Sequence, residues 1–277
     1  MQGTLNKPSD NRWRSRGCAS LLFAVALSPL GVGQAGAEPE PEPAVEPGCP
    51  QTEVIFARGT DQAPGPGDVG QLFINAFQAR TAGIASDVYS VNYPASQQYS
   101  LAIDGVVDAR NRLLDMANRC PDTQLVLGGF SQGAAVIGYL TADKVPPGVT
   151  LPDGVDGPLP NAIADHVAAV VLFGKPDKDF LTSFAGGAPE IIIGEPFKAK
   201  TLELCAPGDF VCSDGGDLFA HTTYPFNGMI DQAADFAVPR VRAGLGIDGE
   251  PAAPSADAAP PADVAAQAPE GTPHGVN

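Results

Sequence analysis

The sequence predicts a single α/β domain in which helices cover both faces of a mostly parallel sheet. Apolar runs alternate with amphipathic stretches over most of the chain. Two of these runs, 123–130 and 167–174, are almost continuously hydrophobic, as strands buried on both faces of a parallel sheet are. Sites in such sheets lie beyond the carboxyl ends of the strands, so the residues after each strand are the first candidates.

Five segments have the composition of strands, with Val, Ile, Leu, Phe and Tyr between turn residues. They are TEVIFARGT at 52–60, DVYSVNYPA at 87–95, TQLVLGGF at 123–130, VAAVVLFG at 167–174 and AKTLELCAP at 199–207. Four segments repeat apolar residues at helical spacing or read as small-residue helices. These helix candidates are 68–84, 98–119, 132–142 and 229–244.

Both ends of the chain differ from this pattern. Residues 1–37 combine three arginines, a short apolar stretch and an AGA cleavage site, which predicts a secretory signal peptide rather than an uncleaved membrane anchor. Residues 38–48 form a Pro/Glu-rich spacer, and residues 246–277 form a Pro/Ala-rich tail that we expect to be disordered. The folded domain is therefore expected over 49–245.

The charge of the chain excludes some partners. Its formal net charge is −16, and removal of a leader that contains Lys7, Arg12, Arg14 and Arg16 against Asp10 makes the remainder more acidic. Such a surface repels nucleic acid and gives no attraction to anionic lipid. It favours solubility outside the cell.

Four cysteines remain once Cys18 leaves with the signal peptide, and an even number in an exported chain predicts two disulfides. Four cysteines allow three pairings. Cys205 and Cys212 are the natural local pair, which leaves Cys49 with Cys120. The chain has no CxxC spacing of the kind that binds metal.

Ser131 is the candidate nucleophile. GFSQG at 129–133 fits the G-x-S-x-G pattern, in which the serine stands on a sharp turn. The residues two positions before and two positions after the serine must be small. The pattern alone is common, but here it follows a predicted buried strand and opens a helix, which is the context it requires.

The candidate base follows by elimination, because the chain has three histidines. His274 lies in the tail. His166 precedes a buried strand and so lies at the opposite end of the sheet. His221, in a loop before the last helix, is the remaining candidate.

The carboxylate that orients such a base follows the serine and precedes the histidine in α/β-hydrolases. Asp209 follows the fifth strand inside the Cys205–Cys212 loop, where a disulfide would stiffen it. Four other aspartates compete with it on position: Asp177, Asp179, Asp214 and Asp217.

An oxyanion hole needs two hydrogen-bond donors. One should be the backbone N–H of Gln132, directly after the serine. The other should come from the loop after the first strand, where Thr60 offers an N–H and a hydroxyl.

Four segments taken together resemble the cutinase family, and more narrowly its secreted actinobacterial cutinase-like esterases. They are FARGT, GGFSQGAAV, CAPGDFVC and AHTTYPFNGMIDQAADF, and the resemblance extends over roughly 49–245. It implies a compact α/β-hydrolase with a central five-stranded parallel sheet and no large lid. The two inferred disulfides match the family's pattern.

By residue, the resemblance implies that Ser131 is the nucleophile, Asp209 the acid and His221 the base, with Thr60 and Gln132 at the oxyanion hole. It implies hydrolysis of ester or lipid substrates through an acyl-enzyme, without a metal or organic cofactor. Many members have serine where this chain has Thr60, and the extra methyl group would narrow the acyl pocket.

Two other functions remain open at this point. A polysaccharide acetyl esterase on the same fold would need a polar acyl site, whereas Pro225 and Phe226 after His221 favour an apolar groove. A catalytically silent secreted surface protein would not need Ser131. We expect a monomer outside the cell, with contact to the cell wall or to a lipid surface as a further expectation.

Overall fold

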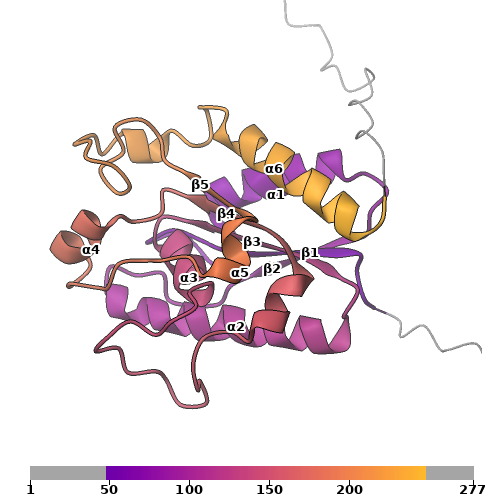
Figure 1. The fold of residues 1–277 in the computed structure, drawn as a ribbon. Coiled ribbons are helices and arrows are strands. Elements are labelled where there is room, and N and C mark those ends of the chain that lie inside the picture. Colours follow the sequence, from indigo (N-terminus) through magenta and orange to yellow (C-terminus); the bar gives the residue numbers. More distant parts are fainter. Residues whose placement is uncertain (1–47, 248–277) are drawn as a thin grey trace, which may run out of the picture. The chain divides into compact units, whose positions relative to one another are not determined.

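The computed structural model describes residues 48–247 (Figure 1). The expected signal peptide, nearly all of the Pro/Glu-rich spacer and nearly all of the C-terminal tail lie outside the described residues. Within the described part, no helix has the length and apolar character that crossing a membrane requires.

A five-stranded parallel sheet is the centre of the fold, as expected from the sequence. The strands are β1 (Thr52–Ala57), β2 (Ser86–Ser90), β3 (Gln124–Phe130), β4 (Val167–Phe173) and β5 (Thr201–Leu204), and their spatial order is β2-β1-β3-β4-β5. Every neighbouring pair is parallel. The carboxyl ends of all five strands therefore share one edge of the sheet, called the carboxyl edge below.

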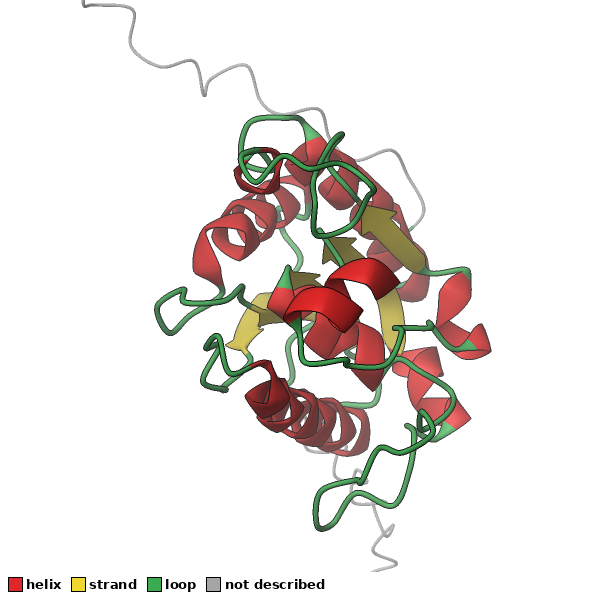
Figure 2. Ribbon diagram, turned by 90° about the vertical axis from the view of Figure 1, so that its left-hand side faces the viewer, coloured by secondary structure: helices red, strands yellow, loops and turns green. Residues whose placement is uncertain are grey.

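Helices cover both faces of the sheet (Figures 1 and 2). Helices α1 (Gly67–Arg80) and α6 (Met229–Gly244) pack together on one face, and α2 (Ala102–Arg119) and α3 (Gln132–Leu140) pack together on the other. The shorter helical segments are η1 (Tyr99–Leu101), η2 (Asn161–His166), α4 (Lys178–Phe184), α5 (Glu195–Lys198) and η3 (Ala220–Thr222).

The core has two halves because side chains alternate between the faces of a strand. In β1, Val54 and Phe56 belong to the apolar cluster under α1 and α6, whereas Ile55 and Ala57 belong to the cluster under α2 and α3. All four side chains are fully buried. This two-sided burial explains why the strands read as continuous apolar runs.

The boundaries of some elements differ from the prediction. The expected strands at 52–60, 87–95 and 199–207 are shorter in the structure, because the chain turns into loops at the carboxyl edge. There the buried Arg58 side chain donates hydrogen bonds to the carbonyls of Gln62 and Tyr93, which tie two of these loops together. The sequence reasoning did not include α4 or α5, which have 7 and 4 residues.

Residues 48–247 contain two disulfides, with the pairing expected. Cys49–Cys120 joins the start of the domain to the segment before β3, across 71 residues of sequence. Cys205–Cys212 closes a short loop directly after β5, at the carboxyl edge. The second bond thus lies where a site in this fold is expected.

Candidate active site

Ser131 stands on a strained turn between β3 and α3. Its φ of 55° and ψ of −118° lie in a region that residues with a side chain rarely adopt. Its N–H donates to the carbonyl of Phe173 at 2.9 Å, which fixes the turn against the end of β4. The structure therefore has the sharp strand-to-helix turn that the G-x-S-x-G pattern predicts.

Two glycines make this turn possible. A Cβ on Gly129 would lie 2.3 Å from the carbonyl oxygen of Gly133, and a Cβ on Gly133 would lie 2.0 Å from the carbonyl oxygen of Ala57. Both obstacles are backbone atoms, which cannot rotate away as a side chain can. The first turn of α3 thus packs directly against the end of β1.

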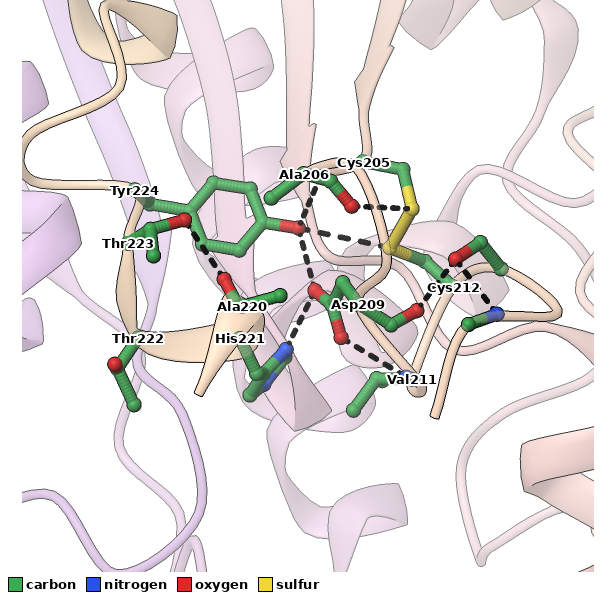
Figure 3. A network of polar contacts seen from close by, with 12 residues as sticks. Cys205, Ala206, Asp209, Val211, Cys212, Ala220, His221, Thr222, Thr223 and Tyr224 are labelled. Atoms are coloured by element: carbon green, nitrogen blue, oxygen red, sulfur yellow. Dashed lines mark hydrogen bonds and ion pairs between the residues drawn. A yellow bond between two sulfur atoms is a disulfide. The ribbon is translucent and has the colours of Figure 1, made fainter. Parts of the chain in front are cut away.

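Asp209 lies in the disulfide-closed loop after β5 and is fully buried. Its carboxylate accepts hydrogen bonds from His221 Nδ1 at 2.8 Å and from the hydroxyl of Tyr224 at 2.7 Å, both on Oδ2, and from the N–H of Val211 at 2.9 Å on Oδ1. Figure 3 shows these three donors converging on the carboxylate.

Burial disfavours the charged form of Asp209, but the hydrogen bonds from His221, the Val211 N–H and Tyr224 outweigh it and lower the pKa of Asp209 below its ordinary value. Burial conversely raises the pKa of Tyr224, whose hydroxyl remains a donor. The group facing His221 Nδ1 is thus a carboxylate anion at neutral pH, which holds the imidazole with its other nitrogen, Nε2, free to accept a proton.

Packing on three sides places the imidazole of His221. The Phe130 ring, one residue before Ser131, stacks on it with centroids 4.9 Å apart, and the Phe210 ring meets it edge-on at 6.2 Å. A Cβ on Gly174, at the end of β4, would lie 2.9 Å from His221 Cε1. The His221 side chain is 16% exposed, so one side faces the surface.

The structure brings Asp209 and His221 into direct contact. Ser131 lies next to this pair, because the preceding residue, Phe130, stacks its ring on the imidazole. Among the described residues, no hydrogen bond joins the Ser131 hydroxyl to His221. In free enzymes such bonds are often long and close only when substrate is bound.

The expected oxyanion positions lie around the same turn. Gln132 is the first residue of α3, so its N–H has no carbonyl one helical turn earlier to bond with. Thr60 is half-buried in the loop after β1, and the preceding Gly59 packs so closely on the Phe130 ring that a Cβ there would lie 2.8 Å from it. Both candidate donors thus adjoin the Ser131 turn.

The competing residues have other roles. His166 lies at the amino end of β4, where its Nδ1 is 3.0 Å from the Pro121 carbonyl oxygen. Asp177 caps α4 by accepting a hydrogen bond from the Phe180 N–H, and Asp217 accepts one from the Phe219 N–H.

Three further candidates from the sequence remain. His274 lies outside the described residues. The two remaining aspartates, Asp179 and Asp214, are exposed.

Sequence reasoning missed Tyr224, which contributes a hydrogen bond to Asp209. No local sequence pattern indicates this contact, because η3 ends at Thr222 and Tyr224 lies in the loop beyond it. Cys205, Asp209 and Cys212 also lie close enough to suggest metal ligands. Their two sulfurs are bonded to each other, so this group has no thiolates to offer.

The chain is similar to proteins of one family. A family model described as cutinase matches residues 48–241. Carboxylesterase Culp1 of Mycobacterium tuberculosis is 40% identical over 220 residues, which are 79% of this chain and 90% of the relative. Phospholipase Culp4 of the same organism is 40% identical over 235 residues, which are 85% of this chain and 98% of the relative.

Solved structures show the same fold. A Trichoderma reesei cutinase in complex with a phosphonate inhibitor is 33% identical, with a TM-score of 0.53 over 70% of this chain and 77% of that one. An acetylxylan esterase at 22% identity has a TM-score of 0.57 over 70% of this chain and all of that one, which is a likeness of fold alone. With the fold, the strained serine turn and these relatives together, the chain belongs to the cutinase family.

Proposed function

We propose that this chain is a serine esterase that hydrolyses carboxylic esters through an acyl-enzyme on Ser131. The observation that carries the proposal is the buried Asp209–His221 pair, 2.8 Å apart, next to a serine held on a strained turn. Catalytic sites are where such strain and buried charge are found together. The relatives named carboxylesterase and phospholipase support the same reaction class.

In the proposed first step, His221 Nε2 takes the hydroxyl proton of Ser131 as the serine oxygen attacks the ester carbonyl carbon. The anionic Asp209 carboxylate stabilises the imidazolium that forms and holds its Nδ1–H. The tetrahedral intermediate then collapses, and the alcohol leaves with the proton from His221. Water, deprotonated by the same His221, attacks the acyl-enzyme carbonyl; the bond to Ser131 Oγ then breaks, His221 returns the proton to that oxygen, and the carboxylic acid is released.

The developing oxyanion needs donors that are already in position, because reorienting them during the reaction would cost free energy. We assign this role to the N–H of Gln132 and to Thr60. The Gln132 side chain is 3% exposed, and its Nε2 donates to the carbonyl of Ser96 at 2.9 Å. This bond supports a fixed position for the residue that follows the nucleophile.

The surroundings of His221 favour an apolar substrate over a polysaccharide. Leu218 and Phe219 lie just before His221 and are 68% and 74% exposed, and Phe226, five residues after it, is 89% exposed. Large exposed side chains of this kind mark contact with apolar ligands or lipid surfaces. We therefore propose lipid-like or medium-chain esters as the substrate class.

We further propose that the chain acts outside the cell as a monomer, after removal of residues 1–37. Two disulfides support an oxidising compartment, because such bonds persist there and are rare in the cytosol. Contact with the cell wall or a lipid surface is proposed on the same exposed apolar side chains.

Hydrolysis of p-nitrophenyl esters of graded acyl length tests the proposal. The Ser131→Ala variant should lose about 10⁶ in kcat, because the remaining groups then have no nucleophile to activate. Ser183→Ala, an exposed serine on α4, is the matched control and should retain full activity. Equal rates for wild type and Ser131→Ala on every ester would refute the proposed mechanism.

A further inference from the structure

A second recess lies apart from the site around Ser131. It is a cavity of about 670 Å³ between α2 and the long loop that joins α3 to η2. Ser131, Asp209 and His221 do not line it. The loop lies below α2 in Figure 1. The volume falls within the range of pockets that hold small molecules, about 300–1,000 Å³.

The wall formed by α2 is a half-buried, mainly apolar stripe beside the stripe that faces the sheet, and within it Val106 also packs against the core. Ile103, Val106, Val107 and Arg110 recur at helical spacing and line the cavity. All four are half-buried, whereas the neighbouring stripe of α2 that faces the sheet is buried. The helix thus has a second apolar face, covered by the loop.

The loop forms the wall of the cavity opposite α2. It runs through residues 142–159 without a helix or strand, a length that in compact domains usually belongs to a functional loop or to a linker segment. Five of its apolar residues line the cavity, and the last of them, Leu159, also belongs to the core: Val145, Val149, Leu151, Val155 and Leu159.

The charge of this cavity is opposite to that of the chain. Arg110 and Lys144 are the charged residues of its lining, which contains no Asp or Glu, although the chain has 32 acidic and 16 basic residues. Within residues 48–247, neither Arg110 nor Lys144 forms an ion pair with a carboxylate. An apolar cavity with two cations that have no acidic partner suits an anion attached to an apolar chain.

The two cations lie toward the end of the cavity that is farther from Ser131. Both α2 and α3 begin near the carboxyl edge, Arg110 lies about 12 Å along α2, and Lys144 follows the far end of α3. Tyr99 and Phe184 line the near end, and the Phe184 ring contacts Phe210, which in turn contacts His221.

We propose that this cavity binds a long-chain fatty acid, with its carboxylate at Arg110 and Lys144 and its alkyl chain along α2 toward Tyr99 and Phe184. The acyl chain of an ester bound at Ser131 would be another occupant of this cavity. It fits less well than a fatty acid, because its far end carries no charge to pair with the two cations. The site is thus distinct from the proposed catalytic centre.

Calorimetric titration of the full chain carrying Ser131→Ala with sodium dodecanoate, below its micelle concentration, tests the proposal without turnover. Dodecanoate should bind, and affinity should fall about fourfold for each methylene removed in decanoate and octanoate. Dodecanol, with the same chain and no charge, should bind at least about tenfold more weakly. Replacement of both cations, Arg110→Gln with Lys144→Gln, should remove that preference.

Val107→Asp places a carboxylate in the apolar wall and should weaken dodecanoate binding at least about tenfold. Leu72→Asp is the matched control, because Leu72 is a 39% exposed helical residue on α1, on the opposite face of the sheet. A thermal unfolding transition checks that each variant is folded.

Equal binding of dodecanol and dodecanoate, or full binding by folded Val107→Asp, would overturn the proposal. Because these titrations need no ester hydrolysis, failure of the proposed function and failure of this site give separate results.

Discussion

Asp209 combines two properties that oppose one another, full burial and a negative charge. A buried carboxylate without partners would be protonated at neutral pH. Three donors prevent this, and they come from three separate points of the chain: Val211 in the same loop, His221 on η3, and Tyr224 just beyond it. The anion thus exists because the Cys205–Cys212 loop and the η3 turn meet.

Asp209→Asn should retain the shape of the site and lose most of the catalytic rate. The amide cannot hold the Nδ1–H of His221 as an anion does, so the imidazole adopts the wrong tautomer and kcat should fall about 10⁴. Steady-state kinetics on a p-nitrophenyl ester measure the change. Asp214→Asn, an exposed aspartate two residues past Cys212, is the control and should have wild-type kcat. A fall below tenfold for Asp209→Asn would assign the orienting carboxylate elsewhere.

The lowered pKa of Asp209 also predicts how stability depends on pH. A carboxyl whose folded pKa lies below its unfolded value stabilises the fold above that unfolded value, about 3.9. This contribution is lost as the pH falls through the folded pKa. Urea unfolding of wild type and Asp209→Asn at pH 7 and at pH 3 should therefore show a larger difference in unfolding free energy at pH 7. A difference that grows on acidification would contradict the lowered pKa.

Among the elements, the β3–α3 turn depends on glycine for space rather than for backbone freedom. A Cβ on Gly133 would collide with the backbone of Ala57 and Arg58 at 2.0–2.5 Å. Gly133→Ala should therefore push α3 away from β1 and cost at least about 1–3 kcal/mol of unfolding free energy. Because Gln132 moves with the helix, kcat should fall by about 10² or more.

Gly216→Ala is the control for this substitution, since a Cβ there meets no atom within 4 Å. Its unfolding midpoint and kcat should match those of the wild type. If Gly133→Ala were as stable and as active as Gly216→Ala, close contact between α3 and β1 would not be what holds the turn.

The elements that were predictable from sequence are those with a long or sterically unique local pattern. β3 and β4 read as apolar runs because both of their faces are buried, and the Ser131 turn follows from two glycines at fixed spacing. α4 and α5 were missed because 7 and 4 residues are too few for a helical period to show. Tyr224 was missed because its role depends on how two loops meet, which no local pattern records.

In the molecule as a whole, the two disulfides constrain very different lengths of chain. Cys49–Cys120 closes a loop of 71 residues that contains β1, α1, β2 and α2, whereas Cys205–Cys212 spans 7 residues around Asp209. A cross-link stabilises a fold mainly by restricting the unfolded chain, and a longer closed loop loses more entropy. The first bond should therefore serve stability, and the second should serve the geometry of Asp209.

Paired substitutions separate these two roles. Cys49→Ala with Cys120→Ala should lower the unfolding free energy by roughly 4 kcal/mol, and Cys205→Ala with Cys212→Ala by roughly 2–3 kcal/mol. At a temperature where both variants are folded, the order should reverse for kcat, because only the second pair holds the loop of the carboxylate that contacts His221. Chemical unfolding and ester hydrolysis on the same samples measure both. If the Cys49–Cys120 variant instead lost more kcat while folded, the short disulfide would have no special part in positioning Asp209.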